Sequence, residues 1–300
     1  MKHSDRFAKF LATTVNLNQS RLDDLDTRVA AIIRHLKRSR ALDGMITTSI
    51  PQGSWAQRTI IRPLAGDEFD ADILLRLRDV REWSQHPRKY LSAVTAAFTE
   101  SGRYATLVQK KNRCVRVHYA NLCHVDIVPY VIRGMYPFES KCIVNWDGDC
   151  FEPADPDRLT GWMRRQDGRA KGNLRKSIRL FKYLRDRRDD FSVPSIILTT
   201  LLGNRVNWWG ELLDQYADLP STFASLTSGL DSWLQAHNSL PTINDPSGSG
   251  ASFSHRWSQR SFGRFRDHVH GLSPRVCSAL GEKDSLQSAK LWQQIFGPEF

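Results

Sequence analysis

Apolar residues recur at helical spacing through the first forty residues of the chain. One group ends before a polar break at Asn16–Ser20, and the second continues the spacing after it: Phe7, Phe10, Leu11 and Val15, then Leu22, Leu25, Val29, Ile32, Ile33 and Leu36. The pattern predicts a long N-terminal helical segment, residues 1–40, that forms a spine packed across the rest of the molecule.

From Met45 the apolar period shortens from helical spacing to alternation. Runs rich in β-branched residues predict five strands, at about residues 45–50, 69–77, 104–111, 114–119 and 124–132. A helix that begins at Pro87 falls between two of them, with proline in its first turn. The segment 41–153 is therefore expected to form a mixed sheet with flanking helices.

After Asp155 the pattern becomes helical again. Helices are expected to begin near Asp155, Asn173, Val193, Leu219 and Ser285, and a Gly- and Ser-rich loop covers 245–252. Residues 154–300 are therefore predicted to form a helical lobe that closes over the sheet. The fold class is α+β, with divisions at 1–40, 41–153 and 154–300.

The charge balance narrows the class of partner. The 300 residues carry a formal net charge of +11, which favours an anionic partner such as nucleic acid, nucleotide or phosphate. A solvated basic surface explains the same excess, so charge alone leaves both interpretations open. No apolar run approaches the length of a membrane span, and the first ten residues hold no apolar stretch, so neither a membrane span nor a secretory signal is expected.

The five cysteines are scattered and form no CxxC pair, which indicates a reducing compartment and hence the cytoplasm. His118, Cys123 and His124 are the only grouping that resembles zinc ligands. No second ligand pair follows them, so the sequence does not favour a zinc site.

Acidic residues at two strands carry the first chemical signal. Asp70 and Asp72 point to one face of their strand, where two carboxylates repel each other unless a cation neutralises them. Asp126 is flanked by Val125 and Ile127 and is costly to bury without a partner. A solvated strand edge and an arginine partner are the structural alternatives. If the three carboxylates meet, they form an oxygen site suited to Mg²⁺.

A Gly-Ser pair supplies the second signal, in the stretch QGSWAQRT at Gln52–Thr59. Gly53 lets the backbone approach a triphosphate closely, and the Ser54 hydroxyl can bind anionic oxygens. The order of strand, Gly-Ser, short helix and acid-bearing strand places a phosphate beside the carboxylates. This is the arrangement needed for metal-assisted phosphoryl transfer.

Together, QGSWAQRT, FDAD and HVDIVPY resemble the motifs of the DNA polymerase β superfamily of nucleotidyltransferases. Within it the chain is most similar to the bacterial CD-NTases, relatives of cyclic GMP-AMP synthase and oligoadenylate synthase. The resemblance implies a polymerase β-like core with a helical lobe. It also implies synthesis of a cyclic di- or trinucleotide second messenger in the anti-phage systems called CBASS.

The resemblance further implies a set of ligands. Asp70, Asp72 and Asp126 would be catalytic and hold two Mg²⁺ ions, with Mn²⁺ as an alternative. Substrates would be ATP with GTP, UTP or a second ATP, and a downstream effector would sense the product. Regulatory partner proteins are compatible with this reading. Activation by nucleic acid is not supported, because the chain lacks the zinc insertion of the vertebrate DNA sensor.

Other positions are assigned by the same resemblance. Gln52, Gly53, Ser54, Lys182 and Ser195 would bind nucleotide, although Lys182 could be a surface lysine and Ser195 a plain helix cap. Asp245, Pro246 and Trp257 are interpreted as structural. Several relatives have glycine where this chain has Arg58, which either alters the loop near the second nucleotide or adds a surface charge.

Two other functions fit the sequence. The same acid triad could extend RNA or modify a small molecule, or the fold could have become an inactive nucleotide- or nucleic-acid-binding protein. Three clustered carboxylates argue against an inactive protein, because without a metal they reduce stability.

Overall fold

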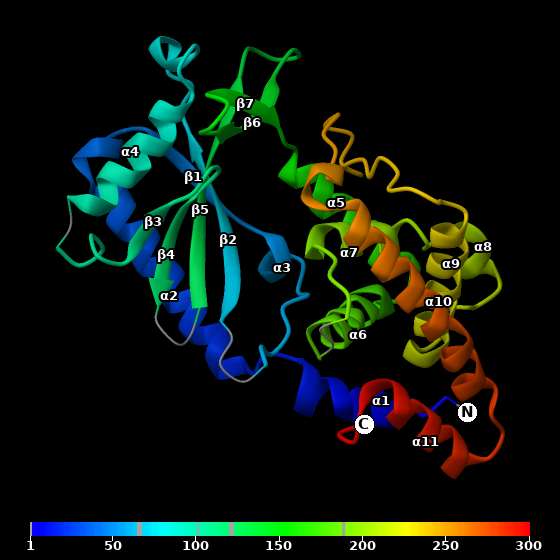
Figure 1. Cartoon of the computed structure of the whole chain (residues 1–300). Coiled ribbons are helices and arrows are strands. Elements are labelled where there is room, and N and C mark those ends of the chain that lie inside the picture. Colours follow the sequence, from blue (N-terminus) through cyan, green and yellow to red (C-terminus); the bar gives the residue numbers. More distant parts are fainter. Residues whose placement is uncertain (1, 65–67, 101, 120–122, 188–189) are drawn as a thin grey trace.

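The computed structural model describes residues 2–64, 68–100, 102–119, 123–187 and 190–300. Figure 1 shows a sheet lobe and a helical lobe, with the N-terminal helices running beneath both. The seven strands of the sheet are β1 Ile46–Gln52, β2 Phe69–Leu77, β3 Val108–Lys110, β4 Val115–Tyr119, β5 Cys123–Arg133, β6 Ser140–Asn145 and β7 Cys150–Pro153.

The helices cover one face of the sheet and fill the second lobe. They are α1 Ser4–Phe10, α2 Gln19–Arg38, α3 Gly53–Ala56, α4 Arg88–Thr99, α5 Pro156–Arg169, α6 Asn173–Arg187, α7 Ser195–Gly203, α8 Trp208–Leu212, α9 Leu219–Gln235, α10 Gln259–Gly281 and α11 Ser285–Phe296. The α+β class and the mixed sheet with flanking helices are confirmed. No helix within the described residues is both long enough and apolar enough to cross a membrane.

The sheet runs in the order β1-β2-β5-β4-β3, and β6 pairs with the last residues of β5, beyond the part that pairs with β4, before pairing with β7. The pairing of β2 with β5 is parallel, whereas the other pairings are antiparallel. The registers align one residue from each of four strands in a single row across the sheet, namely Gln52, Asp72, Asp126 and Arg116.

The two faces of β2 have different surroundings because side chains alternate along a strand. Phe69, Ala71 and Ile73 are buried in a core that also contains residues of α2 and α4. These two helices cover that face of the sheet in Figure 1. Asp70 and Asp72 therefore point to the opposite face, toward the helical lobe.

The N-terminal helices contribute to two separate cores. Phe7 of α1 packs edge-to-face on Trp292 of α11 at 4.9 Å between ring centroids, whereas Leu25 and Ile32 of α2 belong to the sheet core. The chain changes direction between them at the break seen in the sequence, where Asn18 caps α2 by accepting from Arg21 N. The proposed division at 1–40, 41–153 and 154–300 stays a prediction.

Sequence analysis missed some of the regular structure. It assigned neither β6 and β7 nor α10, although α10 spans 23 residues. Pro274 lies inside α10, and Gly263 and Gly271 weaken its helix propensity. Burial of one apolar face, from Phe262 to Val276, compensates for these residues.

We predict that Phe7→Ala lowers the free energy of unfolding by about 3–5 kcal/mol, because the fully buried ring leaves a cavity. Urea denaturation followed by circular dichroism measures the change. Leu286→Ala is the control, since Leu286 is 73% exposed and its truncation removes few contacts. Equal effects of the two substitutions would show that α1 is not anchored as described.

Candidate active site

The acidic residues predicted from sequence lie together at one edge of the interlobe face. Asp72 and Asp126 are directly opposite each other on the parallel strands β2 and β5, and Asp70 lies two residues before Asp72. Neighbouring strands are about 4.8 Å apart, so these carboxylates are close neighbours. Asp126 is buried, Asp72 is partly buried and Asp70 is exposed.

Crowding of negative charge perturbs Asp72. Burial raises the pKa of its carboxyl to about 7, and the charges of Asp70 and Asp126 add to the effect. A carboxyl held half-protonated near neutral pH is a group that gains from a nearby cation. Perturbed acids in a cleft are typical of functional sites.

Asp126 already has an arginine partner. Arg116 on β4 donates from Nε to Oδ1 at 2.7 Å and from Nη2 to Oδ2 at 2.8 Å. The sequence left two interpretations of Asp126 open: a pair with an arginine, or membership of an acid cluster. In the structure Asp126 does both, because it bonds Arg116 and lies opposite Asp72. In the part of the chain described, no three His, Cys, Asp or Glu side chains form a group that could hold a metal ion as they stand.

The Gly-Ser motif lies against the acids. Gly53 opens α3 directly after β1, with φ of 64°, in the left-handed region that glycine favours. A Cβ at this position would collide with Oδ2 of Asp72. The left-handed backbone and this close approach to Asp72 together favour glycine at position 53.

A cavity of about 760 Å³ lies between the lobes above these residues. Its walls include every site residue predicted from sequence, from the sheet lobe and from α6 and α7: Gln52, Gly53, Ser54, Asp70, Asp72, Asp126, Lys182 and Ser195. Its volume falls within the range of small-molecule sites.

Lys182 is not the surface lysine that sequence left as an alternative. It is only 3% exposed, and its Nζ donates to the Thr59 carbonyl oxygen at 3.0 Å. Burial, with a smaller effect of Arg185, lowers the pKa of its ammonium to about 8. Burial makes the charged form of this lysine less favourable. An anion bound in the cavity would stabilise that charge, so Lys182 is suited to bind one.

Two more contacts tie the loop after Ser54 to the helical lobe. Arg175 of α6 donates from Nε to the Gln57 carbonyl oxygen at 2.9 Å, and Gln57 Nε2 donates to Thr160 Oγ1 of α5 at 3.3 Å. With the contact of Lys182 to Thr59, these bonds define the loop anchor. The loop anchor fixes the Gly-Ser loop relative to both lobes.

Ser195 does not cap its helix. Pro194 is the cap residue of α7, and the Ser195 hydroxyl accepts a hydrogen bond from Arg185 Nη1 at 3.0 Å. Arg185 also donates to the Val193 carbonyl oxygen at 3.0 Å. The hydroxyl and the guanidinium therefore line the cavity as one unit beside Lys182.

Arg58 adopts the left-handed conformation, with φ of 54°, and its side chain is exposed. It is absent from the cavity lining formed by the described residues. The backbone geometry explains why glycine suits this position in relatives. Of the two interpretations, the structure favours a surface charge.

Sequence analysis missed three cationic residues of this region: Arg116, Arg185 and Arg256. Alternation along the Val115–Val117 stretch could have placed Arg116 on the acid face, once the strand register was known. Arg256 ends a short 3-10 helix, Ser254–Arg256, between α9 and α10; it lines the cavity, and burial lowers the pKa of its guanidinium. No pattern in the sequence marks it.

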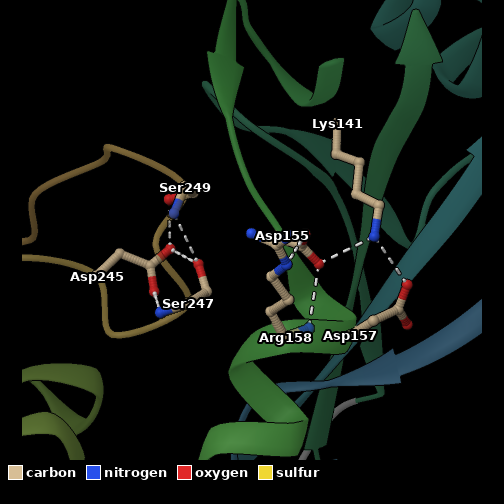
Figure 2. A network of polar contacts seen from close by, with 7 residues as sticks. All are labelled: Lys141, Asp155, Asp157, Arg158, Asp245, Ser247 and Ser249. Carbon is tan, nitrogen blue, oxygen red and sulfur yellow. Dashed lines mark hydrogen bonds and ion pairs between the residues drawn. The ribbon is translucent and has the colours of Figure 1, made fainter. Parts of the chain in front are cut away.

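Two further acids that line the cavity, Asp245 and Asp155, form hydrogen bonds within nearby loops and helices. Figure 2 shows Asp245 bonded to Ser247 and Ser249 within its own loop, with the start of α5 opposite. Asp155 caps α5 by accepting from Arg158 N and also bonds Lys141. The structural interpretation of Asp245 fits these contacts. Trp257 is buried and donates from Nε1 to the Ser192 carbonyl oxygen.

Comparison with protein families identifies the chain. Residues 1–167, more than half of its length, match the Second Messenger Oligonucleotide or Dinucleotide Synthetase domain. The chain belongs to this family. The match confirms the resemblance to CD-NTases inferred from the Gly-Ser and Asp motifs.

Individual relatives agree with this family. A c-di-GMP synthase of Roseivirga ehrenbergii is 23% identical over 257 residues, covering 77% of this chain and 66% of the relative. The chain thus spans just under two thirds of that relative's length. Vibrio cholerae DncV cyclic AMP-GMP synthase, solved with nonhydrolyzable GTP, has a TM-score of 0.75 at 16% identity, covering 99% of this chain and 96% of that one.

Another solved structure shares the fold. The Escherichia coli CdnC:HORMA-deltaN complex gives a TM-score of 0.72 at 19% identity, covering 99% of this chain and 98% of that chain. These likenesses confirm that the fold is the polymerase β-like fold of CD-NTases.

We predict that the free energy of unfolding of Lys182→Met, relative to wild type, is about 1–3 kcal/mol higher at pH 7 than near pH 10.5, because the variant lacks the penalty on the charged lysine. Folding lowers the pKa of Lys182 from 10.5 to about 8, so its charged form destabilises the native state. This penalty is full below pH 8 and disappears as pH rises toward 10.5. The gain of the variant over wild type should follow the same profile in denaturant titrations.

Lys176→Met is the control for this prediction. Lys176 lies on the same helix and is partly buried, with Nζ bonded to Asn173 Oδ1. A stabilisation of similar size and pH profile in both variants would contradict the assignment to Lys182.

Proposed function

We propose that the protein is a metal-dependent nucleotidyltransferase that joins and cyclises nucleoside triphosphates into a cyclic di- or trinucleotide second messenger. The single observation that carries the proposal is the position of Asp70, Asp72 and Asp126 against Gly53, at the base of the interlobe cavity. Membership of the synthetase family supports the same reaction.

The cavity walls provide groups for the triphosphate. The Ser54 hydroxyl and the Lys182 ammonium lie on opposite lobes, and Ser195 with Arg185 adds a second donor pair beside Lys182. Held between these groups, the α-phosphate of one nucleotide faces the acid row. A ribose hydroxyl of a second nucleotide then attacks it, and pyrophosphate leaves. Positioning and electrostatic stabilisation supply most of the rate gain in such transfers.

The donor set fits Mg²⁺, with Mn²⁺ as an alternative, because hard cations prefer carboxylate oxygens. The raised pKa of Asp72 is the observation that supports this fit, since a cation would relieve the charge crowding that raises it. Asp70 and Asp72 would hold both ions, and Asp126 would hold one. When bound, the metal activates the attacking hydroxyl and stabilises the leaving pyrophosphate.

The choice of nucleotides follows from the relatives. One relative is named for c-di-GMP synthesis and another was solved with a GTP analogue, which supports GTP beside ATP as a substrate. UTP or a second ATP remain candidates. CdnC was solved with a HORMA protein, which supports a regulatory protein partner. A CBASS effector that senses the product and a cytoplasmic location complete the proposal.

The direct experiment is incubation of the purified protein with ATP, GTP, CTP, UTP and Mg²⁺, followed by phosphatase treatment and mass spectrometry. A phosphatase-resistant cyclic product supports the proposal and identifies the bases, ring size and linkage. Nucleotide addition that occurs only on added RNA or a small-molecule acceptor would replace cyclisation with the alternative transferase activity. Nucleotide binding without any transfer would indicate an inactive relative.

We predict that Asp126→Asn lowers product formation at least about a hundredfold while the protein stays folded. The amide oxygen still accepts from Arg116, but the negative charge that binds a cation is lost. Product yield and the melting curve are measured together.

Asp157→Asn is the control, because Asp157 is an exposed acid on α5 that contacts only Lys141 among the described side chains. Turnover similar to wild type in Asp126→Asn would remove Asp126 from the site. A loss of equal size in Asp157→Asn would point to a general effect of charge.

A further inference from the structure

Arg116 is the direct counter-cation of the acid row. Within the described residues, no Lys, Arg or His nitrogen lies within 4.0 Å of a carboxylate oxygen of Asp70 or Asp72, whereas Asp126 forms an ion pair with Arg116. The pairing follows from the sheet, since Arg116 and Asp126 face each other in the β4–β5 register.

The pair occupies both oxygens of Asp126. Arg116 makes one hydrogen bond to each oxygen, at 2.7 and 2.8 Å, in the bidentate geometry that is strongest for a guanidinium. Each oxygen of Asp126 therefore already accepts from Arg116 before any nucleotide arrives.

The guanidinium and a divalent cation compete for the same position. A metal ion bound by Asp126 needs one of the carboxylate oxygens and is repelled by a cation a few ångströms away. Without either cation, Asp126 would be a buried charge with no ionic partner, which is strongly destabilising. One cation or the other must therefore accompany the folded state.

We propose that Arg116 is a positioning residue that takes the place of a cation at Asp126 and is displaced when the metal binds. The side chain is 25% exposed, so it has solvent to move into. The guanidinium thereby sets how much metal the site requires and keeps the nucleotide-free site poor in metal. This inference rests on the proposed metal-dependent function.

A second ion pair provides a matched control. Arg113 forms the same bidentate contact with Glu152, at 2.5 and 2.7 Å, and its side chain is similarly exposed. Glu152 is on β7 and also lines the cavity, but it is not one of the three acids of the row. Loss of Arg113 should reduce stability as loss of Arg116 does, but it should leave metal affinity unchanged.

The test is Mn²⁺ binding to the full-length, nucleotide-free protein, measured by electron paramagnetic resonance of the free ion. Arg116→Gln is expected to bind Mn²⁺ on the order of tenfold more tightly than wild type, because a competing charge is gone. Arg113→Gln should bind like wild type. In the Arg116→Gln/Asp126→Asn double variant the gain should disappear.

Equal Mn²⁺ affinity in wild type and Arg116→Gln overturns the inference, as does a gain that survives in the double variant. If Arg116→Gln does not fold, Arg116→Met replaces it, because methionine also removes the charge and keeps part of the apolar stem. Tighter Mn²⁺ binding by Arg116→Met than by wild type then supports competition, and equal binding overturns it.

Assays of nucleotide synthesis distinguish a failure of this inference from a failure of the proposed function. A lower Mg²⁺ concentration for half-maximal rate in the Arg116 variant supports the inference. Absence of any nucleotide product from wild type would instead overturn the proposed function, while the Mn²⁺ titrations would still decide the role of Arg116.

Discussion

The parallel pairing of β2 with β5 is the constraint on which the site depends. It places Asp72 beside Asp126, and a slip of one residue would turn one of the two carboxylates into the core. The register is fixed from the other face, where Ile73 and Ile127 are buried under α2 and α4. The arrangement of polar groups is thus set by apolar packing on the opposite side of the sheet.

Several residues of the cavity are arranged at a cost to stability. Asp72 has a raised pKa and Lys182 has a lowered one. Gly53 loses more backbone conformational entropy on folding than another residue would, and its left-handed conformation favours glycine. Departures from the most stable choice are expected where function selects the residue. These residues differ from Asp155 and Asp245, which line the same cavity but have hydrogen-bond partners in their own loops and helices.

Local patterns allowed part of this arrangement to be predicted. The limits of β2 and the common face of Asp70 and Asp72 follow from alternation within one strand, and the Gly-Ser turn follows from its residues. The burial of Lys182 and the Arg116–Asp126 pair could not be predicted, because each depends on the packing of segments distant in sequence. Likewise, α10 was missed because tertiary packing outweighs the poor propensity of Pro274 and its glycines.

The loop anchor has a mechanical consequence. Arg175 and Lys182 of the helical lobe hold the carbonyl oxygens of Gln57 and Thr59, only a few residues beyond Gly53 and Ser54. A wide parting of the lobes would either break these hydrogen bonds or draw the loop away from the acid row. The position of the Gly-Ser loop is thus coupled to the separation of the two lobes, and a change in one changes the other or costs these bonds.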